Sequence, residues 1–426
     1  MTEYLPRLAE TPLQQLFDDL PAVAVVGPRG CGKTTTASRL VPNIVHLDVP
    51  AVTQAFRNDP DAALRAVGEP VLLDEWQMAP EVLGAVKRAV DSGSGAGRFL
   101  LTGSMTGQLD VDQWPGTGRV TELRMRPMTV AELSGTVSKH GIIDRLLTGD
   151  ARSLQPADPP MSALDIEDYL RLALRGGFPD AAAIPERSRR AWLEGYRNYI
   201  VARDSQLARE GTDPTLFGRF LDTMALNTAT VTSDQTLLDQ AGVTRPTLLQ
   251  YLHLLDRLYL TTTLPAWSTR LAPRLVKAPK RLLADAGLAA AINGVAVEDV
   301  MFDDQLKGRL VETFVIAQLF AEVPFAAASP KMFHLRDSGG RHEIDILLEY
   351  PRQRIVAIEV KASGTISGTD TRHLTWLRDT IGDAFVCGVV LYTGPFTQSL
   401  SDRIIAAPIS TCWAKESIDI MPDDRN

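Results

Sequence analysis

The sequence has few cysteines, no long apolar segment and no excess of basic residues. Its 426 residues contain three cysteines, Cys31, Cys387 and Cys412, which lack the spacing of paired metal ligands. No run of about 18 apolar residues occurs, so we expect no membrane-spanning helix. The net charge of −8 argues against binding nucleic acid over the whole surface, because phosphate backbones attract basic surfaces.

The cysteine pattern and the N-terminal sequence bear on the cellular location, and the length bears on the number of domains. Without a disulfide-like cysteine pattern, a reducing cytoplasm is the simplest compartment. Residues 1–10, MTEYLPRLAE, have no basic region followed by an apolar core, so we expect no signal peptide. The length predicts about two to three domains.

Short apolar runs alternate with helix-like segments over the first 105 residues. We expect buried strands at 22–26, 43–48, 70–74 and 98–102. Because helix-like segments lie between them, the pattern predicts a parallel sheet with crossover helices, and therefore an α/β fold.

Residues 27–34, GPRGCGKT, match the phosphate-binding pattern G-x-x-x-x-G-K-[ST]. The motif follows the apolar run AVAVV and leads into a helix-like segment, which is the expected context. Lys33 would reach the β- and γ-phosphates of ATP, and the Thr34 hydroxyl would ligate Mg²⁺. We expect nucleotide contacts from the whole loop, namely Gly27, Pro28, Arg29, Gly30, Cys31, Gly32, Lys33, Thr34 and Thr35.

Two further strand ends carry polar side chains. The run VLLDE ends in Asp74 and Glu75, as in a Walker B segment. Asp74 would hold Mg²⁺ through water, and Glu75 would polarise the attacking water as a catalytic residue. Thr102 and Ser104, at the end of the next strand, would contact the γ-phosphate side.

An arginine finger is a separate candidate feature. Arg119 is the first choice, with Arg124 and Arg126 as competitors, and a solvated arginine is the alternative interpretation. If Arg119 acts on a neighbouring subunit, the protein must form a homo-oligomer, either a ring or a dimer.

These motifs, taken in order, resemble a family of bacterial and archaeal AAA-type (STAND-like) P-loop ATPases. The C-terminal region of that family, of unknown function, is related to PD-(D/E)xK nucleases. The matching stretches are GPRGCGKT, VLLDEWQ, FLLTGS, GRVTELRMRPMTVAEL, RGGFPD, KAPKRLLADAGLAAAI, GRLVETFVIAQL, EIDILLE and IEVKAS. The resemblance covers about residues 20 to 395 and implies fold and site more firmly than biology.

The C-terminal region carries a second candidate site. Glu359 and Lys361 are two apart on a predicted strand and share a face, and Asp345 lies on the preceding strand. Glu312, on a preceding helix, would complete a shell for Mg²⁺ or Mn²⁺. The resemblance implies the same roles, with Asp345, Glu359 and Lys361 catalytic and Glu312, Asp345 and Glu359 binding metal. A surface salt bridge and an inactive binding module are the alternatives.

Residues 234–262 predict a helix, a Gly-containing turn, a second helix and a strand, which is the pattern of a winged helix-turn-helix. Packing between domains is the alternative role for this segment, and a solvated loop is the alternative for the basic stretch 270–281. The candidate DNA contacts are Arg245, Thr247, Gln250, Arg270, Arg274, Lys277 and Lys280.

These features divide the chain into four predicted domains. We expect a P-loop AAA-type ATPase domain at 1–133, a helical linker or lid at 134–215, a winged helix at 216–275, and a second α/β domain of restriction-endonuclease-like type at 276–426.

Three functions fit this organisation. The preferred one is an ATP-hydrolysing protein that acts on DNA, with a metal-dependent nuclease-like domain that binds or cleaves structured or branched DNA. The second is a ring-forming DNA motor that does not cleave. The third is a nucleotide-dependent switch whose nuclease-like domain is catalytically silent.

Overall fold

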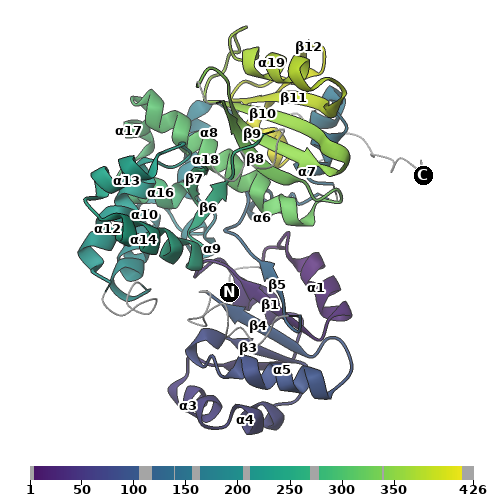
Figure 1. Ribbon diagram of the computed structural model, residues 1–426, viewed down its shortest axis with the longest axis vertical. Helices are drawn as coiled ribbons and strands as arrows, with labels where there is room; N and C mark the ends of the chain where they lie inside the picture. Colours follow the sequence, from purple (N-terminus) through teal and green to yellow (C-terminus); the bar gives the residue numbers. More distant parts are fainter. Residues whose placement is uncertain are drawn as a thin grey trace, which may run out of the picture.

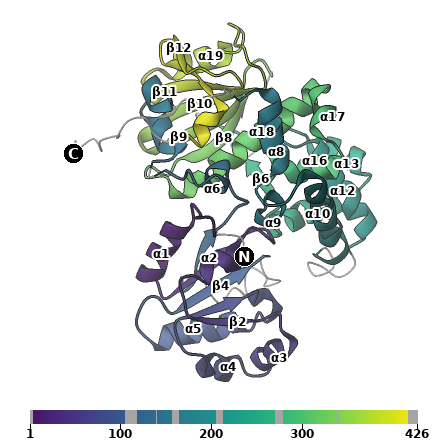
Figure 2. The same ribbon diagram turned by 180° about the vertical axis from the view of Figure 1, so that it is seen from behind.

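The computed structural model describes residues 4–104, 118–138, 140–155, 164–204, 212–268, 278–337 and 340–414. Figure 1 shows a parallel sheet with its helices at the bottom, a mixed sheet at the top, and a group of helices beside them. Figure 2 shows the same three parts from behind.

A five-stranded parallel sheet forms the N-terminal part of the described chain, as predicted. It consists of β1 (Ala22–Val26), β2 (Asn43–His46), β3 (Val71–Asp74), β4 (Phe99–Gly103) and β5 (Thr121–Arg124). The strand order is β2-β3-β4-β1-β5, with β1 paired to both β4 and β5. The carboxyl ends of β1, β3 and β4 therefore meet at one edge of the sheet.

Helices cover both faces of this sheet. They are α1 (Glu10–Asp19), α2 (Lys33–Ala37), α3 (Pro50–Asn58), α4 (Pro60–Ala66) and α5 (Val82–Ser92). Strands β1, β3 and β4 are buried throughout, and alternate residues along each contribute to two separate cores. Such continuous apolar strands are typical of a parallel sheet covered on both sides.

Helices follow the sheet, most of them in the segment 134–215 that is predicted to be a helical linker or lid. They are α6 (Val130–Leu133), α7 (Ile142–Leu147), α8 (Ile166–Arg175), α9 (Pro179–Ala182) and α10 (Glu186–Tyr199). Helix α7 forms because Ile142, Ile143 and Leu146 lie on one buried face.

The predicted order of helix, turn, helix and strand is present after residue 213. The elements are α12 (Pro214–Leu226), α13 (Asp234–Ala241), α14 (Arg245–Arg257), β6 (Thr261–Leu264) and β7 (Lys280–Leu283). Gly242 ends α13 with φ 66°, and the Thr244 side chain caps α14. Strands β6 and β7 pair antiparallel across the predicted domain boundary at 275/276.

The C-terminal part begins with α16 (Ala286–Asn293), α17 (Val297–Met301) and the long α18 (Asp304–Glu322). A mixed sheet of six described strands follows, in the order β12-β13-β11-β10-β9-β8. Its strands are β8 (Lys331–Arg336), β9 (Glu343–Tyr350), β10 (Arg354–Lys361), β11 (Phe385–Tyr392), β12 (Gln398–Ser401) and β13 (Ile404–Pro408).

Helix α18 covers one face of this sheet and α19 (Arg372–Ile381) covers the other. Alternate residues of β10 accordingly join different cores: Val356 and Ile358 pack on the α18 side, and Ile355 and Ala357 on the α19 side. Within the described residues, no helix is long and apolar enough to cross a membrane.

Candidate functional site

The loop GPRGCGKT joins β1 to α2 at the carboxyl edge of the parallel sheet. Gly27, Gly30 and Gly32 have φ values of 155°, 74° and 97°. A Cβ on Gly27 would also overlap with the carbonyl oxygen of Met125. Glycine is therefore required at Gly27 for space as well as for backbone conformation.

Lys33 and Thr34 form hydrogen bonds with other groups of the site. Phosphate oxygens of a bound nucleotide would replace the partners of Lys33, and Mg²⁺ would bind beside Thr34 and its partner. The Lys33 Nζ donates hydrogen bonds to the carbonyl oxygens of Gly27 at 3.0 Å and Pro28 at 2.9 Å. The Thr34 Oγ1 donates to Asp74 Oδ1 at 2.7 Å. Hydroxyl and carboxylate oxygens are the hard ligands that Mg²⁺ prefers, so Thr34 and Asp74 fit the expected ion.

Asp74 is the centre of a small polar network. The Thr102 hydroxyl also donates to Asp74 Oδ1, and His46 Nδ1 lies 3.1 Å from Asp74 Oδ2. The adjacent strands β3 and β4 place Asp74 and Thr102 in register, which brings the two predicted residues together. His46 was not anticipated, although it lies at the end of the neighbouring strand β2.

Glu75 follows Asp74 in a left-handed conformation, with φ 55°. Gln77 Nε2 donates a hydrogen bond to Glu75 Oε2, and the Ser104 Oγ lies 3.4 Å from the same oxygen. Arg29 Nη2 is 3.9 Å from Glu75 Oε2. Glu75 is thus oriented by three side chains, of which Gln77 was missed although it lies within the quoted stretch VLLDEWQ.

Arg7 stabilises the nucleotide loop and was not among the site residues predicted from the sequence. Its guanidinium donates to the Cys31 carbonyl oxygen at 2.6 Å, to the Arg126 carbonyl oxygen at 2.7 Å and to Glu132 Oε1 at 2.8 Å. The side chain is buried. An isolated arginine in an N-terminal segment gives no sequence signal for this role.

Arg119 lies away from the nucleotide loop of its own chain. It precedes β5, so it is at the amino edge of the sheet, where its Nε donates to Asp91 Oδ1 at 2.8 Å. The loop follows the carboxyl end of the parallel strand β1. The prediction that Arg119 binds nucleotide is therefore wrong for the same chain, because the two groups lie at opposite edges.

Arg124 and Arg126 lie at the carboxyl end of β5 and join it to β6. Arg124 Nη2 donates to the Thr261 carbonyl oxygen at 3.4 Å, and Arg126 Nη1 donates to Thr262 Oγ1 at 2.8 Å. Burial lowers the pKa of Arg126 to about 9, with a further contribution from Arg124. Both arginines connect the nucleotide sheet with the middle of the chain.

Helix α10 contacts the nucleotide loop directly. The Tyr196 hydroxyl donates to the Arg29 carbonyl oxygen at 3.0 Å, and Arg29 Nη1 donates to the Tyr199 hydroxyl at 3.0 Å. Trp192 stacks on Tyr196 with ring centroids 5.3 Å apart, and its ring approaches Gly30. A movement of the nucleotide loop would therefore alter its contacts with α10.

The predicted residues of the C-terminal site also come together. Glu312 lies on α18, Asp345 on β9, and Glu359 and Lys361 on β10. Lys361 Nζ is 3.2 Å from Glu359 Oε2, and the backbone N–H of Val360 donates to Asp345 Oδ2 at 3.0 Å. We call Glu312, Asp345 and Glu359 the carboxylate cluster.

Lys280 of β7 enters this cluster. Its Nζ forms an ion pair with Glu312 Oε1 and lies 3.3 Å from Asp345 Oδ1. The residue is 1% exposed. The prediction that Lys280 contacts DNA is therefore wrong, because its ammonium group is buried between two carboxylates.

The pKa shifts follow from burial and from these pairs. Burial and then the charge of Asp345 raise the pKa of Glu312, and the Lys280 ammonium opposes this rise. Burial alone would raise the pKa of Asp345, but Lys280 lowers it below its usual value. Burial and then Asp345 raise the pKa of Glu359, whose Oε1 has no hydrogen-bond partner among the described residues.

The carboxylate cluster does not fit a metal ion as it stands. No group of three or more His, Cys, Asp or Glu residues in the described ranges is placed to hold one. The predicted metal shell of Glu312, Asp345 and Glu359 is corrected accordingly, because the Lys280 ammonium already bonds two of its three members.

The remaining predicted DNA contacts fall on α14 and on residues that the structure does not describe. Arg245 is exposed at the start of α14, and Thr247 and Gln250 are partly exposed on the same helix. Arg270, Arg274 and Lys277 lie outside the described residues. These contacts stay predictions.

Comparison with known families assigns the nucleotide part. Residues 19–134 match the family described as an AAA domain. These residues form a P-loop ATPase domain. Residues 166–299 match a domain of unknown function, DUF8612, and residues 307–412 match another, DUF4143.

The match to the AAA domain therefore precedes the two other matched domains along the chain. The chain is 26% identical over 419 residues to the uncharacterized protein Mb2031c of Mycobacterium bovis and, equally, to Rv2008c of Mycobacterium tuberculosis; the match covers 97% of this chain and 86% of each relative. A solved structure titled "The walker-type atpase paby2304 of pyrococcus abyssi" is similar with a TM-score of 0.40 and 17% identity, over 68% of this chain and 96% of that chain.

Proposed function

We propose that the protein is a nucleotide-dependent switch that binds and hydrolyses ATP with Mg²⁺. In this proposal the C-terminal domain has a nuclease-like arrangement of residues but is catalytically silent. The observation that carries the proposal is Lys280, whose ammonium group pairs with Glu312 and Asp345 inside the carboxylate cluster.

The residues of the ATPase domain suit phosphoryl transfer to water. Lys33 would exchange the carbonyl oxygens of Gly27 and Pro28 for phosphate oxygens. Thr34 and Asp74 would hold Mg²⁺, which supplies charge neutralisation at the phosphates when bound. Glu75, oriented by Gln77 and Ser104, would orient the attacking water and accept its proton.

The nucleotide loop is connected to the rest of the molecule on two sides. Tyr196 and Tyr199 of α10 bond to Arg29 within the loop. Arg124 and Arg126 join the end of β5 to β6, and β6 pairs with β7, which carries Lys280. A nucleotide-dependent change at the loop would be passed along these contacts to both neighbouring regions.

The position of Lys280 in the carboxylate cluster argues against nuclease activity in the conformation that the structure shows. Metal-dependent cleavage needs the carboxylates to hold a divalent ion that activates water. Here Lys280 supplies the positive charge, and its distance of 3.3 Å to Asp345 leaves that carboxylate already paired. Cleavage would first require Lys280 to leave a buried ion pair, which is costly.

Two assays on the same preparations test this proposal. We expect ATP hydrolysis by the wild type and its loss in Lys33→Ala. We expect no cleavage of plasmid or four-way DNA with Mn²⁺, with or without ATP. Cleavage that Glu359→Ala abolishes would establish the nuclease instead, and a protein without measurable ATP affinity would overturn the ATPase itself.

DNA binding without cleavage is the second candidate function. Arg245 is exposed where α14 begins after the Gly242 turn, which is where a helix-turn-helix would meet a groove. Fluorescence anisotropy with linear and forked DNA tests it. Binding that weakens in Arg245→Ala but not in Arg65→Ala, an exposed arginine of α4, would support it.

Oligomerisation is a dependent proposal. Arg119 is half-exposed beside Asp91 and does not reach its own nucleotide loop. It can serve as an arginine finger only for a neighbouring subunit. Sedimentation with ATP and with ADP tests this, because a trans-acting finger requires a dimer or a ring.

A further inference from the structure

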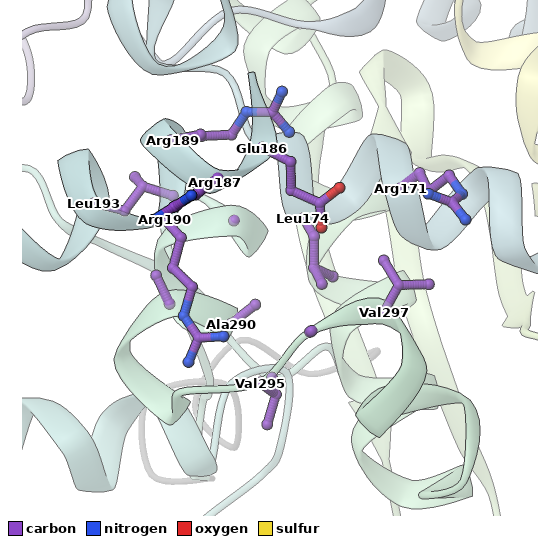
Figure 3. A pocket seen from close by; sticks show the side chains of 13 residues that line it. Arg171, Leu174, Glu186, Arg187, Arg189, Arg190, Leu193, Ala290, Val295 and Val297 are labelled. Atoms are coloured by element: carbon purple, nitrogen blue, oxygen red, sulfur yellow. The ribbon is translucent and has the colours of Figure 1, made fainter. Parts of the chain in front are cut away.

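A cavity of 570 Å³ lies between α8, α10, α16 and the loop before α17. Figure 3 shows Arg190 reaching from α10 toward Ala290 and Val295, with Glu186 beside Leu174. The volume is within the range of about 300–1,000 Å³ that is typical of small-molecule sites. The whole cavity falls within the DUF8612 match at residues 166–299.

The lining has two chemical parts. The apolar part comes from short and branched aliphatic side chains, with Leu174, Leu193, Ala290, Val295 and Val297 as its main members. The polar part is formed by four arginines and one glutamate, namely Arg171, Arg187, Arg189, Arg190 and Glu186. Arginine guanidinium groups recognise phosphate and carboxylate groups in a planar, bidentate manner.

Two of the arginines lack a carboxylate partner. Arg171 pairs with Glu167, and Arg190 pairs with Glu194 at 3.1 Å. Arg189 donates only to the carbonyl oxygens of Ala181 and Ile184. Arg187 has no ion pair or hydrogen bond within the part of the chain that the structure describes. Glu186 also lies in the lining and interacts electrostatically with Arg171 and Arg189, so Arg187 is the arginine whose positive charge is left over at the rim of the cavity.

We propose that this cavity binds a small amphipathic anion, with a phosphate or carboxylate head group at Arg187 and an aliphatic body against Leu174, Ala290 and Val295. Binding is independent of the proposed ATPase function. Its influence on the nucleotide loop rests on that function.

The cavity is connected to the nucleotide loop by two routes. Helix α10 lines the cavity with residues 186–193 and contacts the loop through Trp192 and Tyr196. Asp285, the cap of α16, also accepts a hydrogen bond from the Gly177 N–H at 2.7 Å. Gly177 precedes Phe178, whose ring packs on Tyr196 with centroids 4.8 Å apart. An anion that shifts α10 against α16 would therefore change the surroundings of Arg29 and Gly30.

Titration calorimetry without nucleotide tests the binding site. Octyl phosphate carries both parts of the expected ligand, inorganic phosphate carries only the head group, and octanol carries only the body. We expect saturable binding of octyl phosphate and weaker binding of the other two. Arg187→Glu should weaken octyl phosphate binding by roughly tenfold, the effect of losing about one charge-assisted hydrogen bond.

The matched control is Arg65→Glu, which makes the same charge change at an exposed position of α4. It should bind octyl phosphate like the wild type. Equal loss in both variants, or no saturable binding by the wild type, would overturn the proposed site. Phosphate binding as tight as octyl phosphate binding would overturn the role of the aliphatic wall.

The connection to the loop is tested by repeating the titration with ADP bound. We expect the dissociation constant of octyl phosphate to change, and the constant for ADP to change by the same factor, because coupling between two binding sites is reciprocal. Unchanged constants would overturn the connection. Absence of ADP binding would instead indicate failure of the proposed ATPase function.

Discussion

The ATPase site and the carboxylate cluster each contain a buried lysine, but the two lysines are held by different groups. Lys33 bonds to the carbonyl oxygens of Gly27 and Pro28, which are neutral. Lys280 pairs with the side chains of Glu312 and Asp345. Neutral carbonyls are readily exchanged for phosphate oxygens, whereas a buried ion pair is costly to break. The first lysine is ready for a ligand, and the second already has its partners.

The largest expected effect is the loss of stability when Lys280 no longer pairs with Glu312 and Asp345. Lys280→Met removes the ammonium and leaves Glu312 and Asp345 buried without it, which should lower the free energy of unfolding by about 3–5 kcal/mol. Urea denaturation measures this. The double variant Lys280→Met/Glu312→Gln should recover part of the loss, and a single variant as stable as the wild type would remove the contrast between the two lysines.

The next effect is on catalysis at the ATPase site. Glu75→Gln keeps the hydrogen-bonding shape but not the proton-accepting carboxylate, so ATP hydrolysis should fall by roughly 10²–10³-fold. ATP affinity, measured by equilibrium binding, should stay close to that of the wild type. Gln77→Ala is the companion variant, and it should give a smaller loss because it only orients Glu75.

Glu322 offers a buried carboxylate without a lysine for comparison with Asp345. Burial raises the pKa of Glu322 to about 7. Because the folded-state value lies above the unfolded one, its stabilising contribution is complete at low pH and is lost as pH rises from about 4.5 to 7. Glu322→Gln should therefore be more stable than the wild type at pH 8, by about 3 kcal/mol at most, and similar at pH 4.5. A variant whose advantage grows toward low pH would contradict the assignment.

The smallest effect concerns the contact between α10 and the nucleotide loop. Tyr196→Phe keeps the stacking on Trp192 but loses the hydrogen bond to the Arg29 carbonyl oxygen. One such bond contributes about 0.5–1.5 kcal/mol, so ATP affinity should change by about two- to tenfold. An unchanged ATP affinity would show that this contact between α10 and the loop does not affect nucleotide binding.

The ATPase site was predictable because its residues are contiguous or end neighbouring strands. GPRGCGKT, Asp74 and Thr102 needed only the rule that parallel strands end at one edge. The same rule, applied to β5, shows why Arg119 was misplaced: it precedes its strand instead of following it.

The carboxylate cluster was predictable in part. The spacing of Glu359 and Lys361 on one strand was sufficient to place them together, and Asp345 followed from the adjacent strand. The buried position of Lys280 could not be predicted from the neighbouring sequence, because a stretch rich in basic residues is typical of a solvated loop. Only the pairing of β7 with β6 and the packing of α18 direct its side chain inward. Arg7 was missed for a similar reason, since its three partners are distant in sequence.

A Mn²⁺ titration followed by electron paramagnetic resonance tests most directly whether Lys280 closes the carboxylate cluster. It would use the wild type, Lys280→Met, Asp345→Asn and Lys280→Met/Asp345→Asn, all without nucleotide. We predict that Lys280→Met gains a Mn²⁺ site that the wild type lacks and that Asp345→Asn removes again. A Mn²⁺ site in the wild type that is lost in Asp345→Asn alone would show that the cluster holds metal with Lys280 in place, and would contradict the proposed switch.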